Sequence, residues 1–350
     1  MKSFAVGNRR IGAAEPCFVA AEIGINHNGD MDLARSMIAA AAEAGASAVK
    51  FQNYYTEDFL SDRALTHEYV SGGKTVVESQ FDMFKRCELS AEQLDMLRDY
   101  TQSRGVEFFS TPTSERGLAD LVRLGVPLLK NGSDYLGHLP LIRSMARTGI
   151  PTVLSTGMAT LEDVEDAVLA YREAGGRDLL LLHCTSSYPT PDADVNLNKI
   201  GTLAAAFDCL VGFSDHTWGT LAAQSACMLG ACFVEKHFTT RRDLPGPDQR
   251  FSSTPEELAE LIATIRRLET MRGVGRIGPT ASEAQGREQY RLSCVAAADL
   301  SVGHVLTEAD IAFRRPGTGV PPKQVESLVG RKLLKALPRG HLLDGNEFAR

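Results

Sequence analysis

Two histidines follow two apolar runs of strand length. His216 follows Leu210–Ser214, and His237 follows Cys232–Lys236. The segment between them, Leu221–Leu229, is rich in Ala and Leu and is typical of a helix. A strand–helix–strand unit makes its two strands parallel neighbours, so both imidazoles would leave the same edge of one sheet. Two such imidazoles are plausible ligands of a metal ion, although two unrelated structural histidines would give the same pattern.

Lysines and hydroxyls stand at the ends of other apolar runs. Lys50 and Lys130 end two of them, and buried lysines are rare unless they are paired. They indicate an anionic ligand, phosphate or carboxylate, although a structural ion pair is the alternative for each. The remaining run ends carry Glu22, Gln52, Ser110, Thr111, Ser133, Ser155, Thr156, His183, Thr185, Tyr188, Ser214 and Glu235.

The elements that must position these residues alternate regularly. About eight apolar runs are separated by helical stretches, which predicts an α/β fold, a closed (β/α)8 TIM barrel with its active site at the carboxyl ends of the strands. An open doubly wound sheet is the alternative. It is disfavoured because no GxGxxG motif follows the first strand. A polar insertion, residues 54–85, is expected to be a loop with some helix. The predicted strands are Phe18–Ile25, Ala48–Gln52, Val106–Ser110, Val126–Lys130, Pro151–Ser155, Asp178–Cys184, Val211–Ser214 and Phe233–Lys236.

The composition excludes several classes of protein. The chain has 350 residues, 43% of them hydrophobic and 23% charged, as in folded globular proteins. A net charge of −7 gives no basic surface for nucleic acid. No apolar run is long enough for a membrane span or a secretory signal. The seven scattered cysteines without CxxC spacing indicate reduced thiols, and hence a cytoplasmic protein.

The pattern changes after the eighth run. Pro255–Arg272 is predicted to be the last helix of the barrel, with Thr254 as its N-cap and Glu257 completing a capping box. A Gly-rich polar stretch follows, and then short β-like pieces. We therefore expect a barrel domain over residues 1–272, a linker over 273–288 and a small β-rich domain over 289–350.

Taken in order, the motifs at the run ends resemble those of the sialic acid (N-acetylneuraminate) synthase family, which includes legionaminate and pseudaminate synthases. The tail RRPGTGV (314–320) resembles that family's antifreeze-like (SAF) domain, a small β-clip. The resemblance covers nearly the whole chain. It is carried by AEIGINHNGD (21–30), VKFQ (49–52), FFSTP (108–112), KNGS (130–133), LSTGMATLEDV (154–164), HCTSSYPTP (183–191), VGFSDHT (211–217), VEKHFT (234–239) and LPGPD (244–248).

The resemblance implies a metal-dependent condensation of phosphoenolpyruvate with the open-chain aldehyde of an N-acetylated aminosugar. The sugar would be N-acetylmannosamine or a related 2,4-diacetamido-trideoxyhexose, and the products a nonulosonic acid and phosphate. By the same resemblance, His216 and His237 hold the metal, Mn²⁺ or Mg²⁺ with Co²⁺ as an alternative, and Glu22 stabilises the cation or takes a proton from water. Phosphoenolpyruvate would meet Lys50, Thr111, Lys130, Ser133, Ser155 and Ser214.

The sugar side is expected to involve Tyr188, Asp248 and Arg315. In the family, the arginine that matches Arg315 reaches into the partner's barrel of a domain-swapped homodimer. One loop departs from the family pattern: the acidic residue stands at Asp134 instead of the position of Tyr135, and Gly137 and His138 replace an Asn pair. This departure leaves the identity of the aminosugar open.

Other functions remain as alternatives. The nearest is another phosphoenolpyruvate–aldose aldol synthase, against which the SAF-like tail argues. A metal hydrolase on the same barrel is disfavoured because the first strand carries no HxH motif. A non-catalytic carbohydrate-binding relative is disfavoured because Glu22, both lysines and both histidines are all retained.

Overall fold

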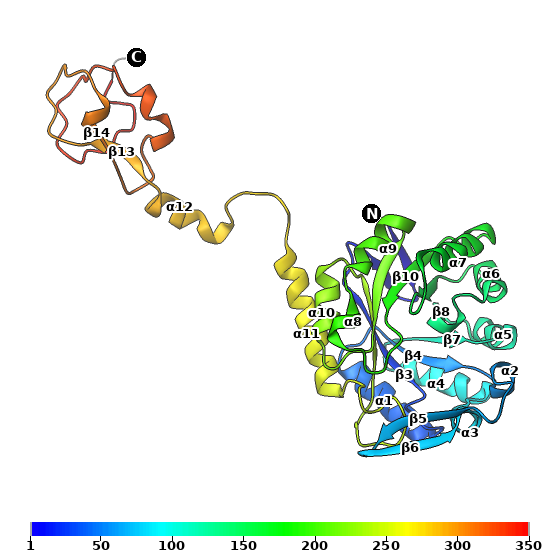
Figure 1. The fold of residues 1–350 in the computed structure, drawn as a ribbon. Coiled ribbons are helices and arrows are strands. Elements are labelled where there is room, and N and C mark those ends of the chain that lie inside the picture. The colour runs from blue at the N-terminus through cyan, green and yellow to red at the C-terminus, as the bar shows by residue number, and fades with distance from the viewer. Residues whose placement is uncertain (1, 349–350) are drawn as a thin grey trace. The chain divides into compact units, whose positions relative to one another are not determined.

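The structure, a computed structural model, describes residues 2–348 and divides the chain into two compact units (Figure 1). The first unit extends to Gly273 and the second begins at Val274. Among the described residues, no helix is long and apolar enough to cross a membrane.

The first unit is a closed barrel of eight parallel strands. Each strand pairs with the next along the chain, and β12 pairs back onto β3, which closes the barrel. This confirms the predicted (β/α)8 barrel and excludes the open doubly wound sheet. The strands are β3 (Phe18–Gly24), β4 (Ala48–Asn53), β7 (Glu107–Pro112), β8 (Leu129–Asn131), β9 (Thr152–Ser155), β10 (Leu179–Cys184), β11 (Leu210–Asp215) and β12 (Phe233–His237).

Helices surround the barrel (Figure 1), and their buried apolar residues pack into the clusters around the strands. In α1, for example, the buried residues Ala34, Met37, Ile38 and Ala41 recur at helical spacing. Helix α11 has the predicted capping box of Thr254 and Glu257. The helices after the strands are α1 (Met31–Glu43), α4 (Ala91–Ser103), α5 (Glu115–Leu124), α6 (Leu139–Arg147), α7 (Leu161–Glu173), α8 (Asp192–Val195), α9 (Lys199–Phe207), α10 (Leu221–Met228) and α11 (Pro255–Arg272).

A plug of apolar side chains fills the barrel interior below the site. Phe18 stacks on Phe233 with ring centroids 5.3 Å apart, and Phe109 packs edge-on against Phe233. The N-terminal hairpin, β1 (Ser3–Val6) and β2 (Arg9–Gly12), adds side chains to the same buried cluster. Since this apolar layer fills the barrel, polar side chains at the carboxyl ends of the strands face a separate space.

The insertion between β4 and α4 contains a hairpin that the sequence analysis did not predict. It consists of α2 (Thr56–Phe59), β5 (Thr66–Ser71), β6 (Lys74–Ser79) and α3 (Gln80–Cys87). Ser71 pairs with Lys74, so Gly72 and Gly73 form a two-residue turn, with φ of +56° and +76°. Positive φ at both turn residues matches the right-handed twist of the strands, and glycine adopts it without strain. The expectation of a loop with some helix is therefore wrong over residues 66–79.

The second unit is small and built around its own core. It contains the helix α12 (Ala284–Tyr290) and the antiparallel strands β13 (Ser293–Ala296) and β14 (Ile311–Arg314). Leucines and isoleucines at irregular spacing, among them Leu300, Leu306 and Leu343, fill its core. Four short 3-10 helices complete the described structure, one in the barrel unit at Ser133–Tyr135 and three here at Ala281–Glu283, Glu308–Asp310 and Pro322–Ser327.

Candidate active site

A cavity of about 920 Å³ opens at the carboxyl ends of the barrel strands. The barrel residues expected to bind metal, phosphoenolpyruvate or sugar all line it, while Arg315 belongs to the second unit. Four other polar residues at the run ends do not line it: Ser110, Thr156, His183 and Thr185. Cavities of this size lie at the upper end of small-molecule sites and have room for two small molecules. The selected residues that line it are Glu22, Lys50, Thr111, Lys130, Ser133, Ser155, Tyr188, Ser214, His216, His237 and Asp248.

Four buried charges of alternating sign cross the floor of the cavity. Lys50 Nζ lies 2.7 Å from Glu22 Oε1 and 3.9 Å from Glu235 Oε1. Lys130 Nζ lies 3.1 Å from the same Glu235 oxygen, and Ser214 Oγ donates a hydrogen bond to it over 3.3 Å. No side chain of the four charged residues is more than 5% exposed. One oxygen each of Glu22 and Glu235 is buried without a hydrogen-bond partner in the described chain, so both carboxylates can still accept from a ligand.

Strand register places these charges next to each other. Glu22 on β3 is level with Lys50 on β4 and with His237 on β12. An irregularity in the β3–β4 pairing follows directly after Glu22, and Gly24 there has a φ of +52°. A Cβ at Gly24 would lie 3.0 Å from the Glu22 carboxylate. The lack of a side chain at Gly24 therefore leaves room for this carboxylate where it stands.

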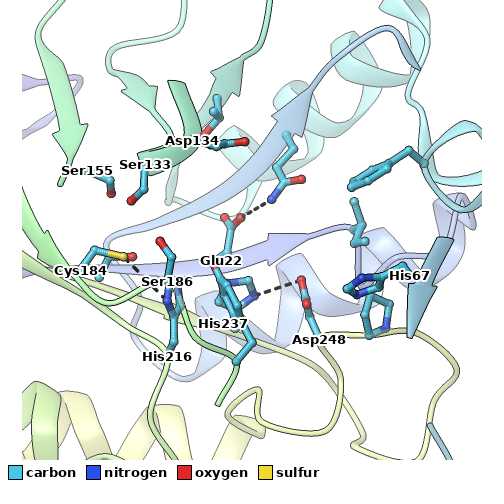
Figure 2. A pocket seen from close by; sticks show the side chains of 18 of the residues that line it. Glu22, His67, Ser133, Asp134, Ser155, Cys184, Ser186, His216, His237 and Asp248 are labelled. Carbon is cyan, nitrogen blue, oxygen red and sulfur yellow. Dashed lines mark hydrogen bonds and ion pairs between the residues drawn. The ribbon is translucent and has the colours of Figure 1, made fainter. Parts of the chain in front are cut away.

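The two histidines lie next to each other at the ends of the adjacent strands β11 and β12 (Figure 2). Their ring centroids lie 5.3 Å apart. The Nδ1–H of His216 donates to the Thr185 carbonyl over 2.9 Å, which leaves the Nε2 lone pair free for a ligand. His237 Nδ1 lies 3.6 Å from Asp248 Oδ2 and has no hydrogen-bond partner in the described structure. Tyr188 packs on His216 with ring centroids 4.1 Å apart.

Burial shifts the pKa values of the groups around the histidines. It raises the pKa of Glu22 to about 7, although Lys50 opposes the shift. It also raises the pKa of Asp248 to about 6. The pKa of His237 falls well below its usual value because of burial and then the neighbouring His216. Burial acts to lower the pKa of His216 too, but the adjacent Cys184 and Thr185 outweigh it and raise that pKa.

These features suit a labile divalent cation. His237 is held neutral, and His216 presents Nε2, so the two imidazoles can act as nitrogen ligands. Among residues 2–348, no group of three or more His, Cys, Asp and Glu is arranged to hold a metal ion. An ion bound here would complete its shell with water and substrate oxygens, as octahedral ions do, whereas zinc would require more protein ligands.

Hydroxyl groups gather on one side of the cavity. Ser133 and Ser155 lie beside each other there, with Cys184 and Ser186 close by (Figure 2). Ser133 Oγ accepts a hydrogen bond from the Gly157 N–H over 3.0 Å. Thr111 Oγ1 accepts a hydrogen bond from Lys50 Nζ over 3.3 Å, so this hydroxyl is joined to the four buried charges of the cavity floor. Ammonium and hydroxyl donors in one place are suited to a phosphate or carboxylate group.

The loop after β8 combines ligand-facing and structural residues. Asp134 lines the cavity, and burial raises its pKa. Tyr135 also lines the cavity, whereas His138 caps α6 by accepting a hydrogen bond from Leu141 N over 3.2 Å. The carboxylate of this altered loop thus remains in the cavity despite its shift by one position.

Sequence reasoning missed two residues that hold the site together. Glu235 was noted only as a strand-end carboxylate, yet it contacts both lysines. Lys236, on the other side of β12, pairs with Asp215 over 3.0 Å, and both side chains are fully buried. Asp215 also accepts the Thr217 N–H, so this pair fixes the turn that carries His216. For both residues, the signal in the sequence is a charged side chain at the end of an apolar run.

Comparison with known proteins identifies relatives over the full length of the chain. The NeuB family model matches residues 37–276, and the SAF domain model matches residues 293–349. The N,N'-diacetyllegionaminic acid synthase of Legionella pneumophila is 38% identical over 96% of this chain and 97% of its own. The human N-acetylneuraminate-9-phosphate synthase is 33% identical over 93% of this chain and 91% of its own. The crystal structure of a sialic acid synthetase from Leptospira borgpetersenii, 34% identical, superposes with a TM-score of 0.74 over 81% of this chain and 95% of that chain.

Proposed function

The chain belongs to the NeuB family of phosphoenolpyruvate-dependent nonulosonic acid synthases, which are transferases, and we propose that it condenses phosphoenolpyruvate with the aldehyde of an N-acylated aminosugar. The products would be a nonulosonic acid and phosphate. The observation that carries the proposal is one cavity lined by His216 and His237, several carboxylates, two lysines and several hydroxyls. This chemistry requires cations and donors for two acid groups, a site for the aldehyde oxygen and a group that handles a proton.

Phosphoenolpyruvate would occupy the side with the serines. Lys130 has one hydrogen-bond partner among the described residues, Glu235, so its remaining ammonium protons are available to a ligand. Ser133 and Ser155 stand beside each other on this side. Thr111 accepts a hydrogen bond from Lys50, and Ser214 donates one to Glu235. Together they would donate to the phosphate and the carboxylate.

The aldose would present its aldehyde to the two histidines. We propose that His216 and His237 hold a divalent ion, Mn²⁺ or Mg²⁺ with Co²⁺ as an alternative, which polarises the aldehyde oxygen when bound. The hydrogen bond to Thr185 fixes the orientation of His216, and the Tyr188 ring covers its face. Asp248, beside His237, would accept a sugar hydroxyl.

Glu22 is placed to handle charge and protons. Carbon 3 of phosphoenolpyruvate would attack the aldehyde, water would add to carbon 2, and the tetrahedral intermediate would lose phosphate. With a pKa of about 7, Glu22 can both stabilise the cationic carbon 2 and take a proton from the water. Its free Oε2 faces no protein donor in the described structure, which leaves it to the substrate.

Phosphate release tests the proposal. Metal-stripped protein receives Mn²⁺, phosphoenolpyruvate and one aldose at a time: N-acetylmannosamine, its 6-phosphate or a 2,4-diacetamido-2,4,6-trideoxyhexose. We expect phosphate with at least one sugar, none without metal, and loss of turnover in His216→Ala and His237→Ala. No release and no binding of phosphoenolpyruvate would instead favour a non-catalytic carbohydrate-binding protein. Unchanged turnover in both histidine variants would overturn the metal assignment.

We further propose a cytoplasmic homodimer in which Arg315 completes the sugar side of the partner's cavity. The seven free cysteines, five of them buried in the barrel, are consistent with a reducing compartment. Arg315 is exposed in the second unit, with its guanidinium 5.1 Å from the Tyr290 ring. A guanidinium is suited to orient an acylamino group through paired hydrogen bonds.

A further inference from the structure

The side of the cavity formed by the hairpin is an apolar wall. This wall consists of lining residues from the insertion between β4 and α4 together with Ile25 from the end of β3. Its two tyrosine hydroxyls are bonded within the protein: the Tyr54 hydroxyl donates to the Phe84 carbonyl over 3.0 Å, and the Tyr69 hydroxyl donates to Glu78 over 2.6 Å. The tyrosines therefore offer ring surface to a ligand. The apolar side chains of the wall are Ile25, Tyr54, Phe59, Tyr69, Val70, Met83 and Phe84.

This wall lies at the end of the cavity remote from the reacting groups. In Figure 2, His67 on β5 stands on the far side of Asp248 from Ser133 and Ser155. A sugar whose aldehyde meets His216 and His237 would therefore direct its opposite end, carbons 4 to 6, toward the hairpin. The groups on those carbons are the ones that distinguish the candidate aminosugars.

The charges of the wall do not suit a phosphate. Among the cavity-lining residues between 54 and 84, which are all described, there is no lysine or arginine and there is one carboxylate, Glu68. Arg86 on α3 is already paired with Glu78 over 3.1 Å. An anionic group on carbon 6 would lose hydration here without gaining an ion pair from the wall.

Two polar side chains of the wall suit an amide. The His67 ring stacks on Tyr69 with centroids 5.6 Å apart and lines the cavity. The Gln80 side chain donates to the Thr66 carbonyl over 3.2 Å, which leaves its own carbonyl oxygen to accept an N–H. A donor and an acceptor between apolar surfaces match an acetamido group with its methyl.

We propose that the hairpin wall selects an aldose that carries a methyl group at carbon 6 and a second acylamino group at carbon 4. The substrate class is then the 2,4-diacetamido-2,4,6-trideoxyhexoses, in preference to N-acetylmannosamine and its 6-phosphate. This proposal rests on the proposed function and narrows its sugar. Val70, half-buried and in the lining, is a specificity-determining residue of the wall.

Steady-state kinetics of the unmodified protein provide the first test. We expect kcat/KM for the diacetamido-trideoxyhexose to exceed that for N-acetylmannosamine by roughly 10- to 200-fold, the range that one apolar group gives in a hydrophobic pocket. The 6-deoxy analogue of N-acetylmannosamine should fall between them, and the 6-phosphate should be poorest. Equal or reversed preference would overturn the selection by the wall while leaving the condensation itself established. Absence of turnover with every sugar would instead contradict the proposed function.

A matched pair of variants tests the wall itself. Val70→Thr keeps the shape of the side chain but adds a hydroxyl at a position that lines the cavity. Val77→Thr makes the same change on the neighbouring strand β6, where the side chain is 59% exposed and does not line the cavity. We expect Val70→Thr to reduce the preference for the 6-deoxy sugar by about fourfold, the value of one buried methyl group, through KM. The KM for phosphoenolpyruvate should stay constant. An equal effect of both variants, or none from Val70→Thr, would contradict the assignment.

Discussion

At the scale of single residues, Glu235 lies between two buried lysines and is the ion-pair partner of Lys130. Its Oε1 lies 3.1 Å from Lys130 and 3.9 Å from Lys50, inside a site that excludes most solvent. Removing one partner of a buried ion pair leaves an uncompensated charge, which costs far more than the pair contributes. The carboxylate is therefore a structural requirement for placing two cations where a doubly anionic substrate would bind.

Glu235→Gln should lower the free energy of unfolding by about 3 kcal/mol because Lys130 then loses its only charged partner within 4 Å in the described structure. Urea unfolding measures this change. The control is Glu43→Gln, which breaks the ion pair to Arg104 at 3.2 Å on the surface, where Glu43 is 75% exposed. Glu43→Gln should lower the free energy of unfolding by less than about 1 kcal/mol. Equal losses in both variants would show that the buried network does not behave as an ion pair.

The raised pKa of Glu22 predicts opposite pH trends for activity and for stability. Burial raises its pKa to about 7, so the carboxylate that would accept a proton becomes the main form above that pH. We expect kcat/KM to rise with pH through about 7 and the rise to vanish, with most of the activity, in Glu22→Gln. The native state binds this proton more tightly than the unfolded chain does, so stability should fall as pH rises from about 4.5 to about 7. A flat pH profile of the unmodified protein would contradict the role of Glu22.

The sequence could predict which side chains meet but not how they pair. Residues at the carboxyl ends of parallel strands must share one mouth, so Glu22, Lys50 and both histidines could be brought together by topology alone. Pairing across the barrel depends on register and on strand tilt, which no local pattern encodes. That is why Glu235 was not recognised as the partner of two lysines, and why the Asp215–Lys236 pair was missed.

At the scale of elements, the hairpin β5–β6 forms one side of the cavity at the barrel mouth. Its signal was present in the sequence: Gly72-Gly73 stands between two runs that contain Tyr, Val and Thr, which is typical of a two-residue hairpin turn. The polar residues around it masked the pattern because the strands lie on the surface with one face half-buried. The barrel strands, buried on both faces, gave continuous apolar runs and were predictable for that reason.

Replacing both turn glycines by alanine should loosen the hairpin. Each alanine would be forced to a φ of +56° or +76°, at a cost of about 1–2 kcal/mol per residue. We expect faster hydrogen exchange over residues 66–79 and a higher KM for the sugar, without a change in the KM for phosphoenolpyruvate. Gly72→Asn is the control, since asparagine tolerates this conformation in hairpin turns. An unchanged exchange rate over the hairpin in the double alanine variant would show that the turn does not hold its strands.

At the scale of the whole molecule, the regular alternation of elements determined the barrel. Eight parallel strands that each pair with the next along the chain cover both edges of the sheet by closing into a barrel. The second unit has its own core, and α12 is tied to it because Gly317 N–H donates to the Glu288 carbonyl over 2.6 Å. Separate cores explain why a composition change near residue 273 was visible in the sequence, whereas the start of α12 inside the expected linker was not.

Mixing two inactive variants tests whether the second unit serves a partner's barrel. His237→Ala removes a proposed metal ligand from the barrel, and Arg315→Ala removes the guanidinium from the second unit. In a swapped dimer, the heterodimer joins the intact barrel of one chain to the intact Arg315 of the other and regains one complete site. Random pairing of equal amounts makes half of the dimers mixed, so phosphate release should return to about a quarter of normal. If Arg315 acts within its own chain, the mixture stays as inactive as its components, because every barrel then lacks either His237 or its own arginine.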